Sequence, residues 1–188
     1  APGAGARRAR FDLRPGPAQI HSNRGVMLAN LPETEGALAA FGKAIELNPS
    51  LADAHSNIGN LLKLTDRRDE AIEAYRKAIA LRPDYPEAHN NLGAALEEKG
   101  ELDEALIELR HAVRLVPNYP EALNNLGNVY QDLGRLDEAF DAYNRSLAAR
   151  PAYPDARANR GNAFRAAQKL DEAMIDYRAA LELRPQSP

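Results

Sequence analysis

Asparagine recurs at one fixed interval along the chain. Each of these asparagines lies 34 residues after the one before it, at Asn23, Asn57, Asn91, Asn125 and Asn159. A carboxamide both donates and accepts hydrogen bonds, so a row of them could pair with the backbone of an extended peptide. The alternative is that these amides only bond to the backbone of neighbouring helices. We predict a peptide-binding role for the row, together with nearby amides of the same repeats: Asn60, Asn90, Asn124, Asn128 and Asn162.

Histidine follows the same interval at His21, His55 and His89, which raises the question of a metal site. Equivalent residues on packed helices are roughly 8–10 Å apart, whereas a bond from histidine to zinc is about 2 Å long. The three rings therefore cannot share one ion. We expect them to be partly buried packing residues, and we expect neither a metal ion nor a cofactor.

No group of residues indicates catalysis. The recurring acidic pairs open helices, where a negative charge favours the helix N-terminus; they are Asp103-Glu104, Asp137-Glu138 and Asp171-Glu172. Phosphate-binding loops, nucleophile elbows and zinc-protease motifs are all missing from the sequence. We therefore predict a protein that is not an enzyme.

Composition narrows the class of protein further. A net charge of −3 argues against a nucleic-acid-binding surface, which usually carries a basic excess. The absence of cysteine excludes disulfides and thiolate metal sites. No apolar run approaches the roughly 20 residues that span a bilayer. We expect a cytoplasmic protein that does not bind membranes.

The elements that must position the asparagines follow a 34-residue period. Glycine, alanine and proline each recur five times in this register, at Gly25, Gly59, Gly93, Gly127 and Gly161, at Ala37, Ala71, Ala105, Ala139 and Ala173, and at Pro49, Pro83, Pro117, Pro151 and Pro185. We divide the chain into five units, each numbered from position 1 to position 34: 18–51, 52–85, 86–119, 120–153 and 154–187. The asparagines of the row then occupy position 6.

Each unit reads as two helices. In the third unit, Pro86 suits a first helical turn, and Gly100 suits a helix end. Position 8 is glycine and position 20 is alanine, so we expect the two helices to cross closely there. Large residues at positions 11 and 24 are expected to fill the wider end. The predicted fold is an all-α, elongated solenoid in which each repeat contacts only its neighbours.

Two units depart from the pattern. Position 7 is Arg24 in unit one and Arg160 in unit five, where we expect the side chains to lie over apolar surface with their charges in water. Unit one also has Pro32 between its helices, and Gly36 and Gly42 within the second helix. Because each helix-interior glycine costs roughly 0.5–1 kcal/mol, unit one should be the loosest.

These phased residues resemble the tetratricopeptide repeat family, whose pattern has Leu-Gly at positions 7 and 8, Ala at 20, an aromatic at 24 and Pro at 32. Unit two carries Ile58-Gly59, Ala71, Tyr75 and Pro83 at these places. The resemblance covers 170 of 188 residues. It implies a right-handed superhelix whose first helices line a concave groove, and a function as a protein–protein interaction scaffold that binds a peptide.

The resemblance also implies the character of the groove. We expect positions 2, 5, 9, 12, 13, 33 and 34 to line the groove. They carry eight acidic and two basic residues, an excess of six negative charges. The acidic residues are Asp53, Asp84, Glu87, Glu97, Glu98, Glu121, Asp132 and Asp155, and the basic residues are Lys63 and Arg165. We therefore expect a neutral to basic, extended peptide partner. The lysine–arginine clamp with which some family members bind C-terminal carboxylates is missing. For Tyr85, Tyr119 and Tyr153 at position 34, packing is favoured over ligand contact.

A narrower resemblance is to the repeat region of O-linked N-acetylglucosamine transferases. It rests on segments such as residues 48–57 and 82–88. In those enzymes the matching asparagines form a ladder that holds an extended peptide. The alternative hypothesis is therefore that the chain is the substrate-selecting segment of a larger glycosyltransferase.

Two further predictions concern residues 1–17 and the outer side of unit five. Residues 1–17 are expected to form a disordered linker or tail. Unit five ends without a polar cap, so we expect its outer side to be apolar and to contact either further chain or, by self-association, a second copy.

Overall fold

A computed structural model describes residues 15–31 and 33–184 of the chain. These residues form helices throughout, with no strand among them. The helices, in chain order, are α1 (Pro17–Ala29), α2 (Thr34–Leu47), α3 (Ala52–Leu64), α4 (Arg68–Leu81), α5 (Pro86–Lys99), α6 (Leu102–Leu115), α7 (Pro120–Asp132), α8 (Leu136–Ala149), α9 (Pro154–Ala166) and α10 (Leu170–Leu183).

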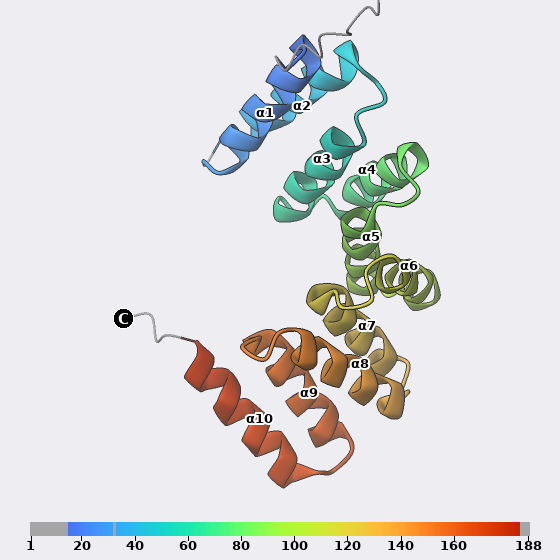
Figure 1. The fold of residues 1–188 in the computed structure, drawn as a ribbon, viewed down its shortest axis with the longest axis vertical. Helices are drawn as coiled ribbons and strands as arrows, with labels where there is room; N and C mark the ends of the chain where they lie inside the picture. The colour runs from blue at the N-terminus through green and yellow to red at the C-terminus, as the bar shows by residue number, and fades with distance from the viewer. Residues whose placement is uncertain (1–14, 32, 185–188) are drawn as a thin grey trace, which may run out of the picture.

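The ten helices form five hairpins stacked in an elongated, curved array (Figure 1). Each helix packs against its hairpin partner, and the second helix of one hairpin packs against the first helix of the next. The contacts reach no further than the adjacent hairpin. This arrangement confirms the predicted all-α solenoid of five repeats.

The two helices of a hairpin cross where position 8 is glycine. In unit four, a Cβ atom on Gly127 would lie 2.5 Å from Cε1 of Tyr143, the residue at position 24. Tyr75 covers Gly59 in the same way, whereas in unit three Leu109 covers Gly93. The expectation that position 24 fills the wider end of the hairpin is therefore wrong. Its side chain lies directly over the glycine, which has no room for a side chain of its own.

Local sequence explains where the helices begin and end. Pro86 occupies the first turn of α5, as predicted, and Pro120 and Pro154 occupy the same place in α7 and α9. The chain turns with a positive φ at position 15, where Gly100 and Gly134 accept that conformation without strain. Asp66 and Gln168 adopt it with φ of 60°.

Arg160 at position 7 does not keep its charge in water. Its guanidinium donates to both carboxylate oxygens of Asp176 at 2.7 Å. It also donates to Asn144 at 2.6 Å. Asp176, at position 23, is 2% exposed. Our expectation for Arg160 was therefore wrong, because the acidic partner lies on the other helix of the same hairpin. Arg24 has no acid at the equivalent position and is exposed.

The two end units differ from the interior of the array. In unit one, α1 buries only Ser22 and Gly25, because it has a neighbouring hairpin on one side alone among the described residues, while its contact with α2 is as extensive as that within the other hairpins. At the other end, Leu170, Met174 and Leu181 of α10 are 61%, 50% and 70% exposed. The prediction of an apolar outer side on unit five is confirmed.

Some predictions fall on residues outside the described part of the chain. They concern the tail over residues 1–14, Pro32 between the first two helices, and the end of unit five after Arg184. Within the described residues, none of the helices has the length and apolar character needed to cross a membrane.

The crossing predicts opposite effects for two glycine-to-alanine substitutions. Gly127→Ala should lower the free energy of unfolding by about 1–3 kcal/mol, because the new methyl group collides with Tyr143. Gly42→Ala is the matched control, since Gly42 lies within α2 with no atom near its Cβ direction. It should stabilise the protein by about 0.5–1 kcal/mol. Denaturant titration measures both, and a neutral Gly127→Ala variant would contradict this account of the crossing.

Candidate functional site

The position-6 asparagines lie on the first helices of the hairpins, α1, α3, α5, α7 and α9. The backbones of successive first helices approach one another closely, whereas those of successive second helices stay further apart within the described residues. The first helices therefore form the inner wall of the curve. On this wall the position-6 amides are half-buried, except Asn23, which is exposed.

The amides are hydrogen-bonded to one another from unit to unit. Asn125 donates from Nδ2 to Oδ1 of Asn90 at 2.9 Å. Asn90 in turn donates to Oδ1 of Asn91, its neighbour in α5, at 3.1 Å. Equivalent bonds extend this network in both directions, so that it runs through Asn159, Asn124, Asn125, Asn90, Asn91 and Asn60. The network joins four successive hairpins through side chains alone.

Within this network the position-6 amides keep part of their hydrogen-bonding capacity. Asn91 uses one N–H on Asn60 and accepts one bond from Asn90. A carboxamide has two N–H donors and two acceptor lone pairs, so one of each remains. Asn57 makes no side-chain hydrogen bond to any described residue. The buried position-5 asparagines, Asn90 and Asn124, connect members of the row through their side-chain amides.

The position-9 asparagines have a different partner. Asn60, Asn128 and Asn162 accept hydrogen bonds from the position-24 tyrosine hydroxyls, at 2.8, 2.9 and 2.8 Å respectively. Units one and three have Phe41 and Leu109 at position 24, without a hydroxyl, and neither has asparagine at position 9. This pairing within units was visible in the sequence, and it indicates that these three amides close the hairpin.

Arginines at position 31, which our charge count left out, neutralise part of the groove. Arg82 donates to both oxygens of Asp53 at 3.0 and 2.9 Å and holds the pKa of Asp53 below its usual range. The same contact recurs between Arg150 and Glu121 at 2.6 Å. Arg184 and Asp155 form a third such pair. With these arginines included, eight acids face five bases, an excess of three.

The rim tyrosines at position 34 pack as part of the same arrangement. The guanidinium of Arg82 lies 4.4 Å from the ring centre of Tyr85, and that of Arg150 lies 4.9 Å from Tyr153. Both rings are half-buried. Unit three has Val116 at position 31, so its acid at position 2, Glu87, has no arginine opposite.

The remaining negative charge gathers near the C-terminal ends of α5 and α7. Burial raises the pKa of Glu97, and the nearby charges of Asp132 and Glu98 raise it further. Lys63 forms an ion pair with Glu98 at 2.8 Å. A cationic group placed here would favour the ionised form of Glu97.

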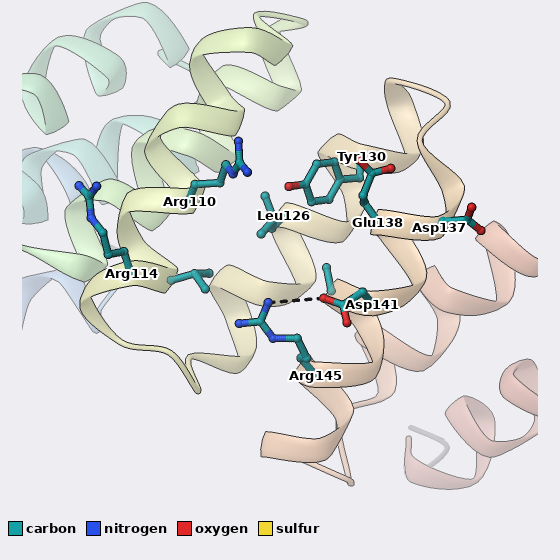
Figure 2. A pocket seen from close by; sticks show the side chains of 10 residues that line it. Arg110, Arg114, Leu126, Tyr130, Asp137, Glu138, Asp141 and Arg145 are labelled. Carbon is teal, nitrogen blue, oxygen red and sulfur yellow. Dashed lines mark hydrogen bonds and ion pairs between the residues drawn. The ribbon is translucent and has the colours of Figure 1, made fainter.

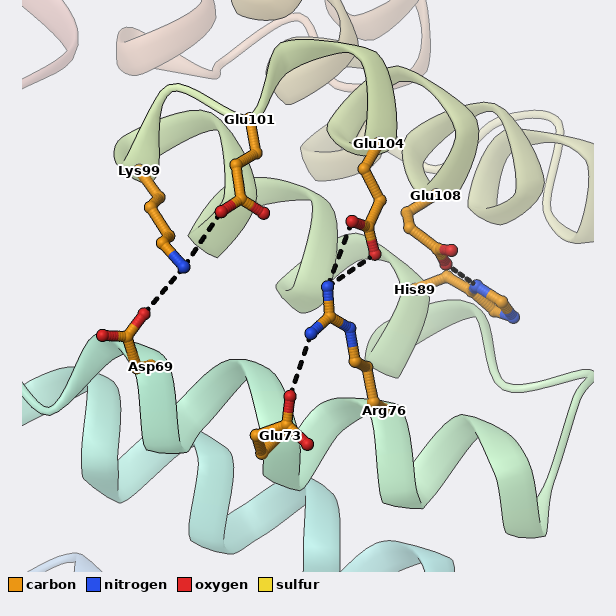
Figure 3. Close-up of polar contacts among 8 residues, drawn as sticks. All are labelled: Asp69, Glu73, Arg76, His89, Lys99, Glu101, Glu104 and Glu108. Carbon is orange, nitrogen blue, oxygen red and sulfur yellow. Dashed lines mark hydrogen bonds and ion pairs between the residues drawn. The ribbon is translucent and has the colours of Figure 1, made fainter.

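His89 is held by two acceptors. Its Nε2 lies 2.8 Å from the carbonyl oxygen of Pro83, and its Nδ1 lies 2.5 Å from Oε2 of Glu108 (Figure 3). The ring is 4% exposed and stacks on His111, with ring centres 4.1 Å apart. Arg114 donates to Nδ1 of His111 at 2.8 Å.

The three position-4 histidines are half-buried or buried, as predicted. Within the described residues, no group of histidine, aspartate and glutamate side chains has the geometry to hold a metal ion.

Comparison with protein families matches most of the chain. A family described as TPR repeat matches residues 33–66 and 67–100. Families described as tetratricopeptide repeat match residues 51–82, 84–152 and 124–188. No curated protein sequence matches the chain.

Solved structures share the fold. The chain is 28% identical to YrrB, described as a TPR protein with an unusual peptide-binding site, with a TM-score of 0.72 over 90% of this chain and 87% of that one. MamA is 27% identical, with a TM-score of 0.74 over 85% of this chain and 93% of that one. TTC0263, a thermophilic TPR protein of Thermus thermophilus, is 28% identical, with a TM-score of 0.74 over 90% of this chain and 93% of that one.

The His89 contacts predict a pH-dependent stability. Burial alone would lower the pKa of His89, but the bonds to Glu108 and to the Pro83 carbonyl outweigh it and raise that pKa. A raised pKa in the folded state means that the stabilisation is complete below about pH 6.5, the unfolded pKa. It is lost as the pH rises through the folded pKa.

Substitution of the carboxylate should therefore remove this dependence. Glu108→Gln should destabilise the protein by about 1.5–3 kcal/mol at about pH 6, and by less at about pH 8.5. Glu104→Gln is the control, because Glu104 pairs with Arg76 rather than with histidine; its cost should be small at both pH values. Denaturant titrations at the two pH values provide the measurement. If Glu108→Gln lowers the free energy of unfolding equally at the two pH values, His89 is not charged in the folded protein.

Proposed function

The chain belongs to the tetratricopeptide repeat family, and we propose that it is a scaffold that holds an extended segment of another protein along the position-6 asparagines. One observation carries this proposal. The amides form a continuous row on the inner wall, and those in the network retain an unused donor and acceptor each. A peptide backbone offers the two complementary groups.

The spacing of the row suits an extended chain. Neighbouring packed helices lie roughly 8–10 Å apart, and an extended peptide advances about 3.3 Å per residue. One asparagine would therefore meet the backbone at about every third residue. Because these contacts involve backbone rather than side chains, the site should accept many sequences. A peptide-binding site is also ascribed to YrrB, which has the same fold.

The charge of the wall favours a basic peptide. Glu97 and Asp132 lie close together near the row, and Glu87 has no arginine opposite it. These carboxylates would steer cationic segments toward the groove, and added salt would weaken the effect.

The alternative hypothesis is the substrate-selecting segment of an O-linked glycosyltransferase. It would use the same row of amides to present a protein substrate to a catalytic domain.

Two asparagines separate ligand binding from hairpin closure. Asn57→Ala should weaken binding of a synthetic lysine-rich peptide by about 0.5–1.5 kcal/mol. It should leave the thermal midpoint unchanged, since Asn57 has no side-chain bond within the described residues. Asn162→Ala is the control: it removes the partner of the Tyr177 hydroxyl, so stability should fall and affinity should hold.

Isothermal titration calorimetry at two salt concentrations, beside thermal melts, measures both effects. If Asn57→Ala leaves the affinity unchanged, the row does not bind peptide. Stronger binding of the basic peptide at high salt would overturn the charge preference.

We further propose that, in a preparation of this 188-residue chain by itself, the apolar side of α10 contacts a second copy. Leu170, Met174 and Leu181 occupy positions 17, 21 and 28 of their unit. The residues of α8 at these positions are buried or half-buried against the next hairpin. One of them, Phe140, has its ring centre 4.7 Å from that of Phe164. Sedimentation velocity should show concentration-dependent association of the chain. The double variant Met174→Glu and Leu181→Glu should stay monomeric, and a wild-type chain that is equally monomeric would refute this contact.

A further inference from the structure

A groove lies between the second helices of units three and four, and its two walls belong to helices that do not carry the asparagine row. It encloses about 600 Å³ between α6 and α8 (Figure 2). Its floor is apolar, with Val113 from α6, Leu126 and Tyr130 from α7, and Ala142 from α8. Arg110 and Arg114 of α6 form one wall.

The preceding pair of second helices is tied together across the equivalent place. Arg76 at position 25 of α4 donates from one Nη2 to both oxygens of Glu104 at position 19 of α6, at 2.8 and 3.0 Å (Figure 3). The side chains of this ion pair cross from one second helix to the next.

In the α6–α8 groove the same two residue types are present, but the tie is missing. Arg110 occupies position 25 and Glu138 occupies position 19. Glu138 is instead paired with Arg135 at position 16, whose Nε lies 2.9 Å from it. Unit three has Glu101 at position 16, so no arginine at that position competes with Arg76 for the carboxylate of Glu104. As a result, Arg110 has no carboxylate within 4.0 Å among the described residues.

A second cation lies one turn further along α6. Arg114 donates one bond to His111 and forms no ion pair with a described residue. A guanidinium has five N–H groups and binds carboxylates through two of them at once. Residues four apart on a helix face the same way. The wall therefore presents two unmatched guanidinium groups beside an apolar floor.

We propose that this groove is a second docking surface, for a partner protein segment that places an apolar side chain on the floor and carboxylates on Arg110 and Arg114. The opposite wall, on α8, carries the carboxylates of Asp137, Glu138 and Asp141, and Asp141 is paired with Arg145 at 3.5 Å. A nucleic acid would bring phosphates against those carboxylates, so a short acidic and apolar peptide fits better than a polyanion. The preference for acidic ligands is the reverse of that proposed for the asparagine row.

A charge exchange tests the proposal on the full chain. The probe is a fluorescent peptide that alternates pairs of glutamate and leucine, and its counterpart has lysine at every glutamate. Fluorescence anisotropy should show binding of the glutamate peptide to the wild-type chain. The double variant Arg110→Glu and Arg114→Glu should weaken it at least about tenfold and should gain affinity for the lysine peptide. Arg178→Glu is the matched control, since Arg178 is exposed at position 25 of α10, with no second wall among the described residues.

Arg135→Ala provides a second test, because Arg135 does not itself line the groove, although its guanidinium lies 4.8 Å from the ring centre of Tyr130 on the floor. Without Arg135, Glu138 is free to pair with Arg110 as Glu104 does with Arg76, and the glutamate peptide should lose affinity. The lysine-rich ligand of the asparagine row should bind both groove variants as it binds the wild-type chain. No binding of the glutamate peptide, equal binding by the double variant, or a preference for a single-stranded oligonucleotide would each overturn the proposal.

Discussion

The close crossing of two helices within each hairpin is the constraint on which the rest of the structure depends. It requires a glycine at position 8, because the position-24 side chain lies where a Cβ atom would be, as Tyr143 does over Gly127. This contact fixes how the first helix faces its partner. It therefore decides which side chains of that helix point to the inner wall. Because the crossing recurs every 34 residues, position 6 of each hairpin lies at the equivalent place on the inner wall. The asparagines at position 6 therefore form a row.

The amides of the row join neighbouring hairpins, and the binding that we propose for them would use the hydrogen-bonding capacity that remains. Buried polar groups must be hydrogen-bonded, and Asn90 and Asn124 meet this requirement by joining neighbouring hairpins. Each amide uses only part of its capacity for this purpose. The network also fixes the orientation of the position-6 groups before a ligand arrives, which reduces the ordering that binding would cost.

Much of the fold could be predicted from the sequence, because glycine, alanine and proline at fixed positions constrain the backbone directly. The side-chain contacts could be predicted less well from the sequence. Arg160 is bonded to Asp176 of the facing helix, and Arg82 is bonded to Asp53 at the far end of its own unit. Both contacts depend on where the second helix places its residues in space. The pairing of asparagine at position 9 with tyrosine at position 24 could have been found, since it repeats within the sequence itself.

The two proposed surfaces share α7 but use different residues of it, and they differ in the ligand charge that we propose for each, so the array could hold two partners at once. The proposed function depends most on direct contact between the position-6 amides and the bound peptide. The most direct test follows the side-chain amide signals of asparagine in nitrogen-edited NMR spectra while a lysine-rich peptide is added. The account predicts that the signals of Asn57, Asn91 and Asn125 move and that of Asn162 stays in place. Shifts confined to residues outside the row would contradict it.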